Sequence, residues 1–197
     1  SFSYETLRSF YRDWYRPELM AVIVVGDIDI ATVEAEIKQR FSSIPTSPED
    51  ARKRRSYEVP GHAEPLYSIA TDPEAQRNRI SIMYKRPISD QNSEEAYRRS
   101  LVGALFLGMF NNRLYELTQQ PEPPYLGAYA GEGNFIRTKK FAQLGAVVKD
   151  GQIESGLQTL LVEAKRARQF GFTESELERE NTSLLRGIVQ AYREKDK

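Results

Sequence analysis

Cysteine is absent from the 197 residues, and histidine occurs once. Without cysteine the chain cannot form disulfides, thiolate zinc sites or iron–sulfur clusters, and it has no cysteine nucleophile. The single histidine, His62, lies in a polar stretch where no second histidine could share a metal and no serine nucleophile motif is nearby. We therefore expect no metal ligands and no catalytic residues in this chain. We expect His62 to be exposed and to have no catalytic or metal-binding role.

An excess of charge of one sign and a long hydrophobic run are also missing. The 28 basic residues balance the 28 acidic ones, so composition favours neither nucleic acid nor an anionic membrane as a partner. The most apolar run, Leu101–Phe110, is far shorter than the roughly 17 to 25 residues of a membrane span and predicts a fully buried helix. Because the chain starts at Ser1 without a signal-like segment, we expect it to be a piece of a longer protein.

Hydrophobic periodicity predicts an α/β (α+β) fold with the element order α-β-α-β-β-α-β-β-α-α. The expected strands cover residues 21–25, 66–71, 78–85, 127–135 and 140–149, and the expected helices cover residues 4–15, 30–41, 94–117, 153–170 and 174–192. The sheet should be mixed and largely antiparallel, with helices packed mainly on one face. We expect a single domain over residues 1–197, in which residues 43–64 form an exposed connection.

Several residues mark the ends of these helices. Asn92 or Ser93 can cap the long apolar helix, and Gly171 suits the end of the next one. Thr173 and Glu176 have the spacing of a capping box for the last helix. The carboxylates along that last helix are interpreted as a solvated surface.

Two motifs resemble a known family. The stretch FYRDWYRPELMAVIVVGDID, from Phe10 to Asp29, and FNNRLYEL, from Phe110 to Leu117 and followed by Tyr125, are similar to parts of the pitrilysin/insulinase zinc metallopeptidases, the inverted-zincin type. The order of the expected helices and strands over the 197 residues also fits the α/β domain of this family. The resemblance implies the second, non-zinc domain of one half of a peptidase whose two similar halves enclose a chamber and cleave extended peptides.

In that family the zinc is held by an inverted His-x-x-Glu-His motif and a distal Glu in the first domain, and this chain lacks the motif. The resemblance therefore implies zinc in the parent protein and none in this chain. The implied partners are a peptide substrate, a zinc-bearing domain of the same polypeptide and a second similar half, without nucleic acid or membrane. Family resemblance also suggests the bacterial periplasm.

The resemblance also implies one substrate-binding residue. Family members hold the substrate with an Arg and a Tyr of this domain; the Tyr corresponds to Tyr125, whereas Thr118 stands where the Arg is expected. Threonine cannot supply the charge-assisted donors of an Arg. The resemblance then implies a domain either of the zinc-bearing half, where the pair is not required, or of a degenerate half. Tyr125 could equally be a half-buried aromatic after a proline turn.

Two functions remain open. One is a non-catalytic structural and substrate-enclosing domain of a zinc metalloendopeptidase, and the other is a scaffold or binding subunit of the same descent without peptidase activity. Asn111, Asn112 and Arg113 could contribute to a site, although hydrogen bonding near the helix end explains them more simply.

Overall fold

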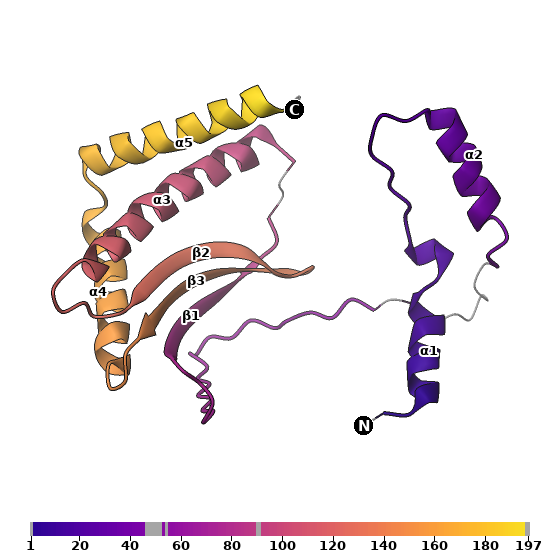
Figure 1. The fold of residues 1–197 in the computed structure, drawn as a ribbon. Helices are drawn as coiled ribbons and strands as arrows, with labels where there is room; N and C mark the ends of the chain where they lie inside the picture. The colour runs from indigo at the N-terminus through magenta and orange to yellow at the C-terminus, as the bar shows by residue number, and fades with distance from the viewer. Residues whose placement is uncertain (1, 46–52, 54, 90–91, 196–197) are drawn as a thin grey trace. The chain divides into compact units, whose positions relative to one another are not determined.

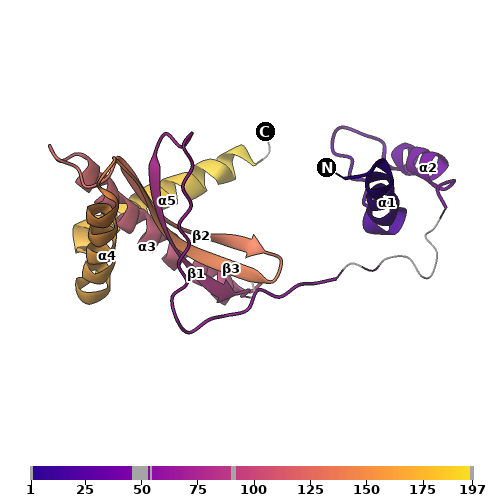
Figure 2. The ribbon, with the colours of Figure 1, turned by 90° about the horizontal axis from the view of Figure 1, so that it is seen from below.

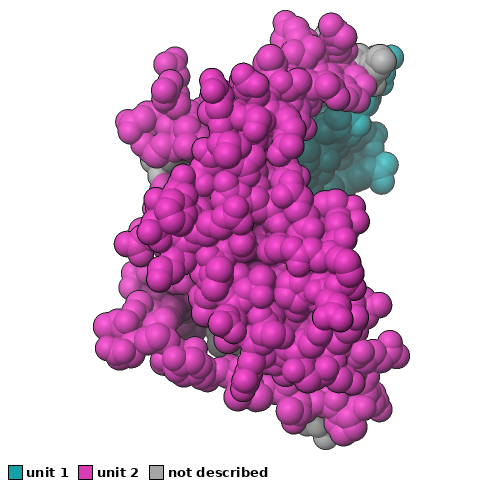
Figure 3. Space-filling model, turned by 90° about the vertical axis from the view of Figure 1, so that its left-hand side faces the viewer, with its two compact units in different colours: residues 1–56 teal, residues 57–197 magenta. Residues whose placement is uncertain are grey.

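The computed structural model describes residues 2–45, 53, 55–89 and 92–195, and the chain divides into two compact units (Figures 1 and 3). Unit 1 covers Ser1–Ser56 and unit 2 covers Tyr57–Lys197. One family domain can contain more than one compact unit, so the single domain over residues 1–197 stays a prediction. The exposed connection at 43–64 also stays a prediction, and residues 46–52 and 54 of it lie outside the described part.

Unit 1 contains the helices α1 (Tyr4–Trp14) and α2 (Ile30–Phe41) with the short 3-10 helix η1 (Pro17–Leu19) between them. Both α-helices begin at side-chain caps. The Ser3 hydroxyl accepts a hydrogen bond from the Thr6 amide at 3.2 Å, and the Asp29 carboxylate accepts one from the Thr32 amide at 2.8 Å. These bonds satisfy amides that the first turn of a helix leaves unpaired.

Unit 2 contains three strands and three helices in the described residues: β1 (Asn78–Pro87), α3 (Glu94–Thr118), β2 (Gly127–Ile136), β3 (Lys139–Val148), α4 (Ile153–Phe170) and α5 (Glu174–Glu194). The predicted helix-capping residues lie at the ends of these helices. Ser93 caps α3, Gly171 follows α4 with a φ of +65°, and Thr173 and Glu176 form the capping box of α5.

The sheet has the strand order β1-β3-β2, and both pairs are antiparallel. Ile80 of β1 and Ala128 of β2 lie opposite Ala146 of β3, so these apolar residues share one face. Helix α3 packs on β2, α4 packs on β3 and β1, and α5 packs on α3 (Figures 1 and 2). The predicted fold class, α+β with a largely antiparallel sheet and helices mainly on one face, is confirmed.

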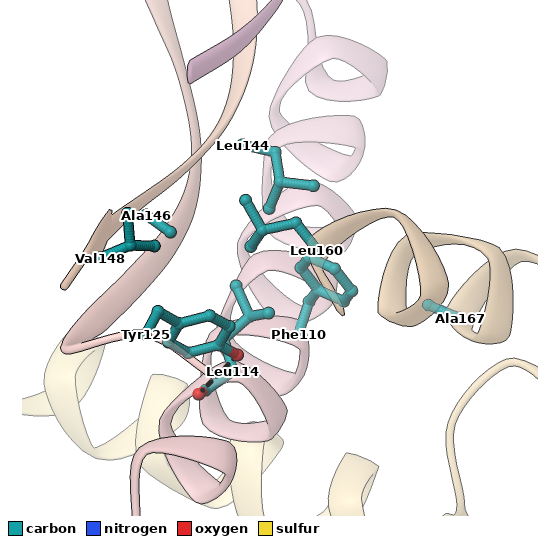
Figure 4. Packing of buried hydrophobic residues seen from close by; sticks show 8 residues of the cluster. All are labelled: Phe110, Leu114, Tyr125, Leu144, Ala146, Val148, Leu160 and Ala167. Atoms are coloured by element: carbon teal, nitrogen blue, oxygen red, sulfur yellow. Dashed lines mark hydrogen bonds between the residues drawn. The ribbon is translucent and has the colours of Figure 1, made fainter. Parts of the chain in front are cut away.

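The core of the described residues lies between this sheet face and helices α3 and α4 (Figure 4). Its cluster comprises Phe110, Leu114, Tyr125, Leu144, Ala146, Val148, Leu160 and Ala167. All of these residues belong to unit 2.

The helix predicted as fully buried over Leu101–Phe110 is buried on one face only. Met109 and Phe110 are buried, whereas Val102 and Phe106 are exposed. The sheet lies on one side of α3 and α5 covers another part of its surface, so part of the apolar run Leu101–Phe110 stays exposed. No helix in the described part of the chain is both long and apolar enough to cross a membrane.

Two of the expected strands are not strands in the structure. Residues 21–25 and 66–71 are not assigned to any strand, and their side chains include the highly exposed Ile23 and Ile69. A strand needs hydrogen bonds to a neighbouring strand, and no described strand pairs with either segment. The pattern of β-branched residues indicated a tendency to form a strand and carried no information about the partner.

Candidate functional site

Tyr125, the predicted substrate-binding residue, lies inside the core immediately before β2 (Figure 4). Its side chain is 0% exposed, and its hydroxyl donates a hydrogen bond to the Leu114 carbonyl at 3.1 Å. Burial, and to a smaller extent the Glu163 carboxylate, raises the pKa of Tyr125 to about 12. The neutral hydroxyl therefore joins α3 to the segment before β2. This geometry favours the buried-aromatic interpretation, and the substrate-binding role stays a prediction.

Thr118 ends α3 and does not form a pair with Tyr125. Its hydroxyl donates to the Tyr115 carbonyl at 2.6 Å and accepts from the Gln119 side chain at 2.8 Å. The hydroxyl thus serves one of the carbonyls that the last turn of a helix leaves without a helical partner. In the described residues Thr118 and Tyr125 share no hydrogen bond, and neither supplies a positive charge to a substrate.

Three consecutive residues of α3, Asn111, Asn112 and Arg113, form side-chain hydrogen bonds to other elements of unit 2; we call them the α3 hub. The Asn111 side chain donates to the Ala130 carbonyl at 2.9 Å and accepts from the Ala130 amide at 2.7 Å, so it serves both polar groups of one β2 residue. Asn112 donates to Glu180 of α5 at 3.2 Å. The hub therefore holds the sheet and α5 to α3.

Arg113 makes the most extensive contacts of the α3 hub. Its guanidinium donates to the two carboxylate oxygens of Glu176 at 2.5 and 2.8 Å and to the Gly171 carbonyl at 3.0 Å. The guanidinium also lies 4.5 Å from the centre of the Phe172 ring. Both partners of the ion pair are largely buried, with side chains 12% and 14% exposed. The pair fixes the turn between α4 and α5 against α3.

The Glu176 carboxylate was expected on a solvated surface, and this interpretation is wrong. Besides Arg113, it accepts hydrogen bonds from the Thr173 amide at 2.6 Å and hydroxyl at 2.9 Å. These interactions, led by the Arg113 hydrogen bond, lower the pKa of Glu176 to about 2. The sequence signalled the capping box but not the Arg partner, which lies 63 residues away in the chain.

His62 is exposed, and its Nδ1 lies 2.7 Å from the Glu64 carbonyl oxygen. Within the described ranges, no three acidic or histidine side chains gather as ligands for a metal ion. The residues present do not fit a zinc site, because tight zinc binding needs three or four convergent ligands. That the chain binds no zinc stays a prediction.

Taken together, the polar groups of unit 2 described above bond to each other and to the backbone, and they stabilise an α+β domain. Residues 1–184 match the family model described as the Peptidase M16 inactive domain, and the chain belongs to this family. The resemblance to the insulinase-type metallopeptidases is thereby confirmed, as is the assignment of this domain as the non-catalytic one.

Curated relatives are much longer than this chain. It is 29% identical over 192 residues to a zinc protease PQQL-like protein of Arabidopsis thaliana and 28% identical over 191 residues to the probable zinc protease PqqL of Escherichia coli. These alignments cover 97% and 94% of this chain but only 17% and 20% of the relatives. The chain therefore spans about a fifth of the proteins it resembles.

Solved structures share the fold over nearly the whole chain. The periplasmic protease PqqL from Escherichia coli matches 97% of this chain and 21% of its own, with a TM-score of 0.77 and 26% identity. A structure of the first half of that protease matches 97% of this chain and 41% of its own, with a TM-score of 0.76.

Proposed function

We propose that this chain is the structural and substrate-enclosing domain of a longer zinc-dependent metalloendopeptidase that cleaves extended peptides. The match of residues 1–184 to the inactive domain of the M16 peptidases carries the proposal. The α3 hub and Tyr125 support it, because their polar groups are used to hold helices and sheet together. In this role the domain supplies a rigid wall, and the reacting groups come from a zinc-bearing domain of the same polypeptide and from a second similar half.

The experiment that tests this function compares the longer protein with the 197-residue chain alone. We expect the longer protein to hydrolyse an unfolded peptide, to lose this activity in a chelator and to regain it with zinc. The chain alone should cleave nothing. Cleavage by the chain alone, or no cleavage by the longer protein, would contradict the proposal.

The isolated chain should also carry far less than one zinc per molecule after dialysis against a chelator. The reason is the ligand inventory, which offers one histidine and no cysteine. Elemental analysis of the purified chain measures this directly, with the zinc-loaded longer protein as the positive control. One tightly held zinc per chain would overturn the non-catalytic assignment.

Replacing Tyr125 with phenylalanine should lower the free energy of unfolding by about 0.5 to 1.5 kcal/mol, the usual worth of one neutral hydrogen bond. Peptide cleavage by the longer protein should stay within a few-fold of wild type, because the hydroxyl faces Leu114. Tyr115→Phe, at an exposed position of α3, is the matched control. A loss of about a hundredfold in turnover, the scale of a missing oxyanion donor, would show that the hydroxyl acts on the substrate.

A scaffold or binding subunit without peptidase activity is the second candidate, and Thr118 at the position of the family Arg favours it. The sequence of the domain that precedes this one decides between the two. A His-x-x-Glu-His motif with a distal Glu there supports the peptidase, and its absence supports the scaffold.

We also propose a periplasmic location, since the structurally similar PqqL is a periplasmic protease. Fractionation of the source cells tests this location.

A further inference from the structure

The segment Ala21–Val25 of unit 1 is a strand-like sequence without a strand partner. It lies between η1 and α2, and no backbone hydrogen bond joins it to the described residues. Ile23 and Val25 are 83% and 91% exposed. Exposed β-branched side chains leave apolar surface in water, and the unpaired backbone groups of an extended segment can pair with another strand. The segment therefore has the properties of a strand whose neighbours are contributed by something else.

The side chains of this segment indicate an interior position in a sheet. In an extended chain Val22 and Val24 point to one face, and Ile23 and Val25 point to the other. A strand with one solvated face alternates apolar and polar residues, whereas a strand covered on both faces is apolar throughout. The helix α2 follows directly, which gives the strand-then-helix order of a parallel βαβ unit.

The described residues of unit 1 form no hydrophobic core of their own. In its described residues no apolar side chain is buried. Leu7, Phe10 and Tyr11 of α1, together with Tyr15 after it, are exposed around a shallow apolar depression. Unit 1 spans only Ser1–Ser56, and a domain of this size buries only about 60% of the surface of its unfolded chain, so its stability is marginal even with a core. The helices of unit 1 therefore need a partner surface, and the chain has no cysteine for a disulfide that could replace it.

We propose that residues 21–25 form an interior strand in the sheet of a neighbouring α/β domain of the same longer polypeptide, and that α1 and α2 pack on that sheet. This inference rests on the proposed function, since it takes the chain to be part of a longer peptidase. Such a sheet is available in principle, because the chain covers only 41% of the solved first half of PqqL. The structural boundary between two domains then lies near residue 56, inside the family domain rather than at its start.

A second copy of this chain satisfies the observations less well. Pairing of two such segments in a dimer gives each strand one neighbour and leaves its other edge unpaired. A gap between two strands of an existing sheet satisfies both edges, and the helices on that sheet cover both apolar faces. Pairing of the segment with the free edge of β1 or β2 would also give it only one neighbouring strand and leave its other edge unpaired.

Amide hydrogen exchange tests the proposal on wild-type protein. In the isolated 197-residue chain, amides of residues 22–25 should exchange within about tenfold of the rate of an unfolded peptide, while those of β3 are protected. In the longer protein the amides of 22–25 should exchange at least about a hundredfold more slowly than in the isolated chain. Protection in the isolated chain, at any concentration, would overturn the proposal in favour of pairing within the chain or between copies. Fast exchange in the longer protein would overturn it as well.

A proline substitution in the longer protein gives a second readout. Val24→Pro removes an amide that an interior strand needs, so trypsin should cleave at Lys38 and Arg40 of α2 at least about tenfold faster than in wild type. Ser56→Pro, at an exposed position between the two units, is the control and should change nothing. Equal cleavage of the Val24→Pro variant and wild type would contradict the proposal.

Peptide cleavage by the same wild-type preparation separates this inference from the proposed function. An inactive longer protein in which residues 22–25 are protected contradicts the peptidase and supports the shared sheet. An active one in which they exchange fast supports the peptidase and refutes the shared sheet.

Discussion

Replacing Leu160 with alanine should lower the free energy of unfolding of unit 2 by about 2 to 5 kcal/mol. Leu160 is 0% exposed and belongs to the core cluster, on the side of α4 that packs against β3 and β1. The loss combines the transfer free energy of the removed carbons with the cost of the cavity they leave, because packed neighbours relax only in part. Small domains are stable by about 5 to 15 kcal/mol, so this variant should be near the limit of folding.

Leu161→Ala is the matched control for this prediction. It removes the same atoms from the next residue of the same helix, where the side chain is 48% exposed. We expect a change within about 1 kcal/mol, since most of this surface stays in water in the folded state. Denaturant unfolding followed by circular dichroism measures both variants, with similar slopes expected. Equal losses at the two positions would mean that α4 does not pack on the sheet as described.

The sequence predicted most of unit 2 because its signals are local. The capping box of Thr173 and Glu176, the Ser93 cap and the glycine after α4 each act within a few residues of the chain. The alternation in β1 and the pairing of β2 with β3 depend on nearby residues as well. Such signals need no knowledge of the rest of the fold.

Contacts between distant residues could not be predicted in this way. Gly108 of α3 lies against the carboxylate of Glu180 in α5, and no local pattern around either residue indicates this contact. Residues 21–25 show the same limit, because their apolar β-branched pattern predicted a strand without indicating a partner, and the described residues form no strand there. Resemblance to the family identified the domain, but whether Tyr125 contacts a substrate is a property of the assembled protein.

Replacing Glu176 with glutamine should lower the free energy of unfolding by about 3 to 5 kcal/mol at pH 7, the usual cost of removing one partner from a buried ion pair. Glutamine keeps the shape of the side chain and can still serve in a capping box, so the loss isolates the charge. It leaves the Arg113 guanidinium, only 12% exposed, without its carboxylate. Glu178→Gln, at an exposed position of the same helix, removes an equal charge and should change the stability by less than about 0.5 kcal/mol.

The pH dependence of this difference follows from the pKa of Glu176. Folding lowers that pKa from 4.5 to about 2, so the carboxylate stabilises the fold fully above pH 4.5, and the contribution disappears as the pH falls toward 2. The shift corresponds to about 3 kcal/mol. Urea unfolding of wild type and Glu176→Gln at pH 7, 5 and 3 should therefore show a gap that is constant from pH 7 to 5 and smaller at pH 3. A gap that stays the same at pH 3 would mean that the stabilisation does not come from the ionised carboxylate beside Arg113.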